Sequence, residues 1–153
     1  MLSPLLTILL ASTGPTPQAL FTCTAMQKQI TITLRDDRLT YSFGPPGRPE
    51  IRLNGGPNGG VFYHRQLYGR GEDQTLRFVN GAWGYVIFNH WHAPEQQGHG
   101  RIAPEYNASG LLVMKGRTIV RRVNCDKGSG DLHEWSIFKR LEQDSENLTP
   151  EDA

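Results

Sequence analysis

Three histidines near the middle of the chain are the residues best suited to bind a metal ion. His90 and His92 lie two positions apart, so an extended strand would place both imidazoles on one face, and His99 follows seven positions later. Imidazole nitrogens are common ligands of Zn²⁺ and Cu²⁺. No cysteine or carboxylate stands at a firm ligand spacing from them. The pattern therefore favours polar residues at a strand end beside Trp91, and we expect no metal.

Two other arrangements of reactive side chains are compatible with catalysis. Cys125 with a histidine would form a thiolate–imidazole pair, and Glu95 with Glu105 would form a carboxylate pair of the kind that cleaves glycosides. No glycine-rich turn or helix start accompanies Cys125, and two glutamates on one polar segment are usually solvated. The sequence therefore predicts a protein that binds another protein, without cofactors, rather than an enzyme.

The longest irregular segment, residues 93–110, is the preferred candidate for a binding site. Loops longer than about 12–15 residues are uncommon in compact domains and often carry function when they are ordered. The end of this segment combines one aromatic anchor with small residues that form hydrogen bonds at little steric cost. The candidate partner-binding residues are Tyr106, Asn107, Ala108, Ser109 and Gly110.

Short segments of alternating polarity surround this candidate loop. Residues 28–34 and 38–43 alternate on either side of a polar turn, and residues 111–114 and 118–123 do the same around Gly116, so both pairs predict hairpins. We also expect strands at residues 50–53, 61–68, 75–79 and 82–88, with Trp83 of the last strand in the core.

These segments predict one all-β domain with antiparallel sheets packed as a sandwich or an open barrel, because about eight short strands follow one another with frequent turn signals. Seventeen Gly and ten Pro supply the turns. Residues 131–141 fit both a strand and a helix, and we interpret them as a strand. The domain covers residues 20–142, and residues 143–153 form an acidic flexible tail.

The N-terminal residues 1–19 indicate a secretory signal peptide. No charged side chain precedes Lys28, and an apolar run at residues 5–11 is followed by small residues and prolines. Seven apolar residues are far fewer than the roughly 20 that span a membrane. In an oxidising compartment the two cysteines, Cys23 and Cys125, are expected to form a disulfide.

The charge balance gives no general attraction to nucleic acid or anionic lipid, since 16 Lys and Arg face 15 Asp and Glu. We therefore expect no nucleic-acid partner.

Four segments in the first third of the chain resemble a pattern found in small exported bacterial proteins. They are Phe21-Thr22-Cys23 and residues 28–32, 39–44 and 49–53. With the length, the cysteine pair and the Ser109 segment, the chain resembles the periplasmic immunity proteins that neutralise a type VI-secreted peptidoglycan amidase. The resemblance implies a periplasmic inhibitor that plugs the cleft of a cognate Cys–His amidase. It also implies a serine on a protruding loop that reaches the catalytic histidine, and Ser109 matches that position. We expect the chain to be monomeric before it binds.

Two alternatives from other classes stay open. A periplasmic lysozyme inhibitor is also exported, β-rich and joined by a disulfide, and Arg101 would suit the carboxylates of a glycosidase. A wall- or glycan-modifying enzyme would use His90, His92 and His99 instead.

Overall fold

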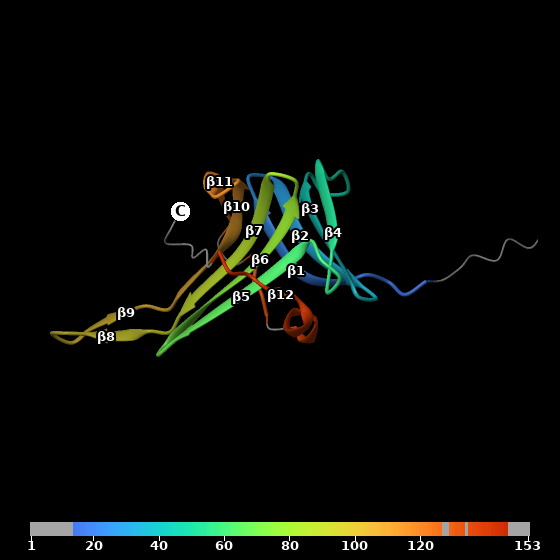
Figure 1. The fold of residues 1–153 in the computed structure, drawn as a ribbon. Coiled ribbons are helices and arrows are strands. Elements are labelled where there is room, and N and C mark those ends of the chain that lie inside the picture. The colour runs from blue at the N-terminus through green and yellow to red at the C-terminus, as the bar shows by residue number, and fades with distance from the viewer. Residues whose placement is uncertain (1–13, 127–128, 134, 147–153) are drawn as a thin grey trace, which may run out of the picture.

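The computed structural model describes residues 14–126, 129–133 and 135–146, and it shows the predicted all-β single domain (Figure 1). The strands in these residues are β1 (Gln18–Ala25), β2 (Lys28–Arg35), β3 (Arg38–Gly44), β4 (Ile51–Gly55), β5 (Val61–Tyr68), β6 (Gly71–Asn80), β7 (Trp83–His92), β8 (Glu95–Gln97), β9 (Arg101–Ala103), β10 (Tyr106–Lys115), β11 (Thr118–Asn124) and β12 (Glu142–Gln143), and a 3₁₀ helix, η1, covers Ser136–Arg140.

The first four strands form an antiparallel sheet in sequence order, β1-β2-β3-β4. The predicted hairpin of β2 and β3 is confirmed, because Ile32 pairs with Tyr41 and Arg35 with Arg38. Its turn places Asp36 at a positive φ of 53°. β1 is absent from the predicted strands, and its first two residues, Gln18 and Ala19, lie in the segment assigned to the leader.

The second sheet has six strands in the order β11-β10-β7-β6-β5-β12. Its pairs are antiparallel except for β12, which runs parallel to β5. β7 and β10 pair along ten positions, from His92 opposite Tyr106 to Trp83 opposite Lys115. β6, β7 and β10 are longer than predicted, since their added ends carry polar residues that interrupt the apolar pattern.

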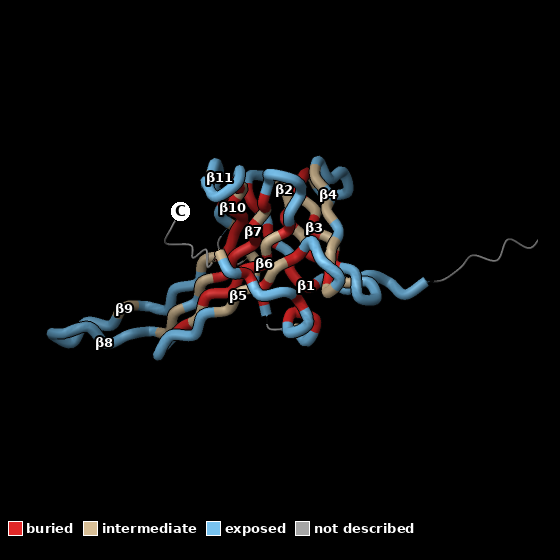
Figure 2. The backbone as a smooth tube through the Cα atoms, in the orientation of Figure 1, coloured by how far each residue is buried: buried red, intermediate tan, exposed pale blue. Residues whose placement is uncertain are grey.

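The hydrophobic core lies between these two sheets, as the buried segments in Figure 2 show. Ile32 and Tyr41 of the first sheet are fully buried, as are Phe78 and Ile87 of the second. The Tyr41 ring centroid lies 5.6 Å from that of Phe78. Burial of an apolar side chain of this size contributes about 1.5–3 kcal/mol each, so this interface is the main source of stability.

The predicted core position of Trp83 is wrong. Its side chain is 40% exposed, because Trp83 is the first residue of β7 and lies outside the core. Tyr85, two residues later, is the first residue on that face of β7 that packs against the core. The Lys115 ammonium lies 5.7 Å from the centroid of the Trp83 ring, which gives the indole a cation–π partner at the surface.

The predicted disulfide between Cys23 and Cys125 is confirmed, with the two Cα atoms 5.6 Å apart. It joins β1 of the first sheet to the residue that follows β11 of the second sheet. The two cysteines are 102 positions apart, and closing a loop of that length in the unfolded chain is worth roughly 4–5 kcal/mol on the chain-entropy model.

The interpretation of residues 131–141 as a strand is wrong, because Ser136–Arg140 forms η1. Ile137 and Phe138 are the buried residues of this helix, and the Phe138 ring centroid lies 5.1 Å from that of Tyr63. Two hydrogen bonds of 2.8 Å from Arg140 to Asp37 hold the helix to the β2–β3 turn.

The start of the predicted flexible tail is ordered, so that prediction is wrong for residues 143–146. Gln143 pairs with Tyr63 of β5, and the buried Asp144 accepts hydrogen bonds of 2.7 and 2.8 Å from Arg77. These bonds raise the pKa of the Arg77 guanidinium. Residues 147–153 lie outside the described residues.

Most of the predicted leader, residues 1–13, also lies outside the described residues, while Gln18 and Ala19 belong to β1. Within the part of the chain that the structure describes, no helix is long and apolar enough to cross a membrane.

Candidate protein-binding site

Residues 93–105 form a projecting hairpin, called the arm here, between β7 and β10. Glu95 pairs with Ala103 and Gln97 with Arg101. His99 and Gly100 turn the chain at its tip with positive φ values of 68° and 72°. In Figure 1 the arm extends away from both sheets, and Figure 2 shows it mostly exposed. The predicted irregular loop is therefore a short hairpin followed by the first residues of β10.

Hydrogen bonds tie the base of the arm to the six-stranded sheet. The Ala93 N–H donates to the carbonyl of Arg70 at 2.7 Å, and the Arg70 guanidinium donates to the carbonyl of Pro94. At the returning end, Trp91 Nε1 donates to Glu105 Oε1 at 2.7 Å. Both ends of the arm are thus anchored before any partner binds.

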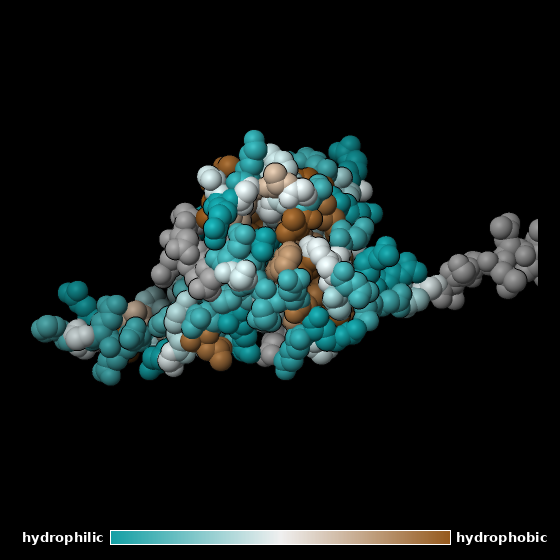
Figure 3. All heavy atoms as spheres, viewed as in Figure 1, coloured by the Kyte–Doolittle hydropathy of each residue, from teal (hydrophilic) through white to brown (hydrophobic). Residues whose placement is uncertain are grey.

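Exposed apolar side chains lie on both faces of the sheet near this base. Strand register aligns Leu67 with Trp91 across β6 on one face, and it aligns Tyr68 with Tyr106 across β6 and β7 on the opposite face. All four side chains are exposed, and Ile102 on the arm itself is 69% exposed. Figure 3 shows a brown patch on the largely teal surface near this end of the sheet. Exposed aromatic and large aliphatic residues are typical of protein interfaces.

Sequence reasoning missed Leu67, Tyr68 and Trp91 as exposed residues at the base of the arm. Leu67 and Tyr68 end a strand that otherwise contributes to the core, so their pattern is that of ordinary strand residues. One sequence feature could have indicated them, namely that these large apolar residues lie at strand ends close to residues 93–105.

The five predicted partner-binding residues do not lie at a loop tip. They are the first residues of β10, and their exposure falls along the strand: Tyr106 and Asn107 are exposed, Ala108 is half-buried, and Ser109 and Gly110 are buried. The arm precedes them and carries the projecting tip.

Ser109 faces the interior of the protein. Its side chain donates a hydrogen bond of 2.8 Å to the carbonyl of Gly130, and the residue is only 6% exposed. A Cβ atom at Gly130 would lie 2.5 Å from Ser109 Oγ and 2.9 Å from Cys125 Sγ, so only glycine fits there. The prediction that Ser109 protrudes is wrong, because it packs beside the disulfide.

The three candidate metal ligands have separate surroundings. His90 Nδ1 contacts the buried carboxylate of Asp73, which also accepts a 2.5 Å hydrogen bond from the Tyr68 hydroxyl. His92 Nδ1 lies 3.2 Å from the carbonyl of Ala93, and His99 occupies the tip of the arm. In the described ranges, no group of three or more His, Cys, Asp and Glu side chains is placed to hold a metal ion.

The thiolate–imidazole pair is not assembled, because Cys125 is bonded to Cys23 and has no thiolate to pair with a histidine. The two glutamates lie on opposite sides of the base of the arm. Glu105 accepts the hydrogen bond from Trp91, and Glu95 lies on β8 opposite Ala103. Both glutamates are exposed.

Comparison with known proteins gives no relative from which a function follows. No protein-family model matches the chain, and no curated protein or solved structure matches it either.

Proposed function

We propose that this chain is an immunity protein whose arm enters and blocks the active-site cleft of a cognate secreted Cys–His peptidoglycan amidase. One observation supports this most directly: a narrow two-stranded hairpin with exposed side chains projects from a sheet that anchors both of its ends. The chain then acts by binding, and the chemistry belongs to the partner.

Preorganisation of the arm favours tight binding. A hairpin ordered before binding loses little conformational entropy when it enters a cleft, which favours slow dissociation. Ile102 offers an apolar anchor on the arm, while Trp91 and Leu67 supply contact area on one face of its base and Tyr106 on the other. An arm with such a base suits the roughly 1,200–2,000 Å² interface of a stable inhibitor complex.

The resemblance to amidase immunity proteins also supports this proposal. The resemblance implies that the Ser109 segment enters the amidase cleft, whereas we propose that the arm enters it. We place the protein in the periplasm, where the disulfide between Cys23 and Cys125 would persist and where the amidase would attack the wall. A monomer would be the form that meets the toxin, since a single arm per chain suffices to fill one cleft.

A periplasmic lysozyme inhibitor is the second candidate, and one observation favours it. Arg101 is exposed on β9 beside the tip of the arm, where a guanidinium would meet the carboxylates of a glycosidase cleft. The two candidates share the arm and differ in the charge that the cleft presents.

Inhibition by matched surface variants tests the proposal. We expect Ile102→Asp to weaken inhibition of the cognate amidase at least about tenfold, because it places a charge in an apolar contact. Val120→Asp is the control, since Val120 is 51% exposed on β11, away from the arm. The readout is release of stem peptides from purified peptidoglycan, with lysozyme turbidity clearing measured in parallel.

Thermal melts of both variants should match the parent, because each side chain is exposed. Inhibition of lysozyme alone, with loss on Arg101→Ala, would replace the amidase by a glycosidase as the partner. Equal inhibition by the parent and Ile102→Asp would show that the arm does not enter the cleft.

A further inference from the structure

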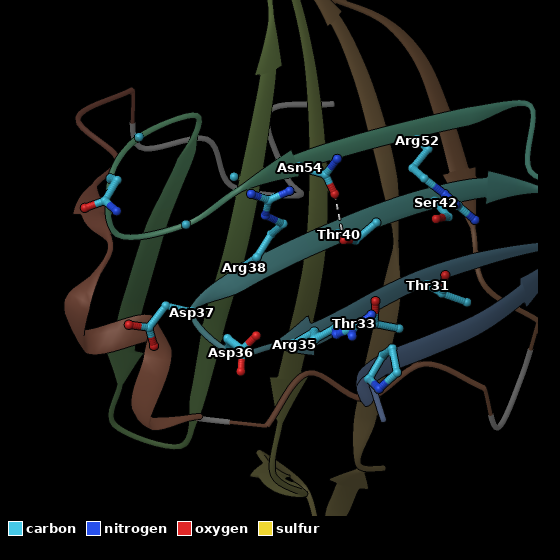
Figure 4. A pocket seen from close by; sticks show the side chains of 15 residues that line it. Thr31, Thr33, Arg35, Asp36, Asp37, Arg38, Thr40, Ser42, Arg52 and Asn54 are labelled. Carbon is cyan, nitrogen blue, oxygen red and sulfur yellow. Dashed lines mark hydrogen bonds between the residues drawn. The ribbon is translucent and has the colours of Figure 1, made fainter. Parts of the chain in front are cut away.

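A polar depression lies on the outer face of the four-stranded sheet, opposite the side that packs in the core. Strand alternation sends Ile32 and Tyr41 inward and the neighbouring residues outward. The outward residues that line the depression include Thr31, Thr33, Thr40, Ser42, Arg52 and Asn54. Figure 4 shows their side chains on one face of β2, β3 and β4.

Hydroxyl and amide groups form two rows across this face. Thr31 pairs with Ser42, which pairs with Arg52. In the next row Thr33 pairs with Thr40, which donates a 2.7 Å hydrogen bond to the side chain of Asn54. Adjacent strands are about 4.8 Å apart. The face therefore presents a regular array of neutral hydrogen-bonding groups.

Three arginines accompany the array. Arg35, Arg38 and Arg52 are exposed, and they form no ion pair with any residue in the described part of the chain. Two carboxylates also line the depression, Asp36 and Asp37. Asp37 forms an ion pair with Arg140, and the hydrogen bonds from Arg140 lower the pKa of the Asp37 carboxyl. Among the described residues, the depression therefore has three unpaired guanidinium groups and only one carboxylate, Asp36, that could balance them.

The glycine-rich segment after β4 closes one end of the depression. Gly56 and Gly59 exchange two backbone hydrogen bonds of 3.0 Å. A Cβ atom at Gly56 would lie 2.4 Å from the carbonyl oxygen of Asp37, so the absence of a side chain lets this segment pack against the β2–β3 turn. The wall is therefore built into the fold.

We propose that this depression binds an acidic oligosaccharide, with the rows of hydroxyl and amide groups bonding sugar hydroxyls and the arginines pairing with carboxylates. Guanidinium groups match carboxylates through two parallel hydrogen bonds, while Thr, Ser and Asn donate and accept at sugar hydroxyls. No large apolar side chain lines the depression. This composition does not suit insertion into a lipid surface or the apolar centre of a protein interface.

Calorimetric titration with tetragalacturonate tests this inference, since that sugar carries a carboxylate on each ring. Arg38→Ala with Arg52→Ala should weaken binding at least about tenfold, because two charge-assisted contacts are lost. Thr31→Val, which keeps the shape and removes one hydroxyl, should weaken it by a smaller factor. Arg117→Ala is the charge-matched control at an exposed turn between β10 and β11, and it should bind like the parent.

Neutral maltotetraose, sodium sulfate and anionic lipid vesicles are the ligand controls. We expect none of them to match tetragalacturonate, and we expect amidase inhibition to be unchanged in the arginine variants. Failure of the parent to bind tetragalacturonate would overturn the inference. Equal binding of the neutral sugar, sulfate or vesicles would overturn it as well, and so would equal losses in Arg117→Ala.

Discussion

Replacing Ser109 by alanine separates a structural role for this residue from a role in partner binding. The substitution removes the 2.8 Å hydrogen bond to the Gly130 carbonyl and leaves that carbonyl without its donor beside the disulfide. A lost hydrogen bond in a buried site costs about 1–3 kcal/mol. We therefore expect Ser109→Ala to lower the free energy of unfolding by about that amount, and Ser109→Arg to cost more because it places a charged side chain at a buried position.

Urea unfolding followed by tryptophan fluorescence measures this effect. With a slope of about 1–3 kcal/mol per molar urea for a small domain, the midpoint should fall by on the order of 1 M at an unchanged slope. Ser42→Ala is the control, because Ser42 is partly exposed on the outer sheet face, and it should change stability by less than about 0.5 kcal/mol. An unchanged Ser109→Ala midpoint combined with lost amidase inhibition would refute the structural assignment.

Two further predictions concern the packing around the core. Asp144→Asn should destabilise the fold by about 2–4 kcal/mol, because it leaves the partly buried Arg77 without its carboxylate; an unchanged urea midpoint would mean that this pair is not formed in solution. Burial raises the pKa of Tyr41, so the folded state resists its ionisation and stability should fall as pH rises above about 10. Tyr41→Phe removes a buried hydroxyl that has no hydrogen-bond partner among the described residues. Its urea midpoint should be as high as the parent's or higher, with a smaller loss between pH 9 and 11.

The strands that the sequence predicts well are those whose side chains alternate between core and water. β2 and β3 carry that pattern, and their pairing follows from a short polar turn. The β10–β11 hairpin lacks the alternation, since β10 is buried on both faces at Leu111 and Leu112, and it is predicted from its turn at Gly116. The missed ends of β6, β7 and β10 contain buried polar residues such as Asp73, Asn89 and Ser109. These are compatible with burial only because distant residues satisfy them, and such partners are not visible in local periodicity.

The candidate site shows the same division. Residues 93–110 do contain the projecting feature, because their length and glycines favour a protrusion. The position of Ser109 within it depends on a hydrogen bond to a residue 21 positions later, and no local pattern indicates that contact. Likewise, Leu67 and Trp91 lie in line across the sheet because of the register of β5, β6 and β7. No single segment of the sequence indicates that alignment.

The two proposed surfaces belong to different sheets, which makes their functions separable. The arm extends from the six-stranded sheet (Figure 1), whereas Arg38 and Arg52 lie on the outer face of the four-stranded sheet (Figure 4). The core lies between these sheets, and the disulfide joins them covalently. A ligand on the outer face therefore leaves the arm accessible. Together the proposals describe a protein that holds an acidic glycan with one sheet while its arm blocks a wall-cutting enzyme from the other.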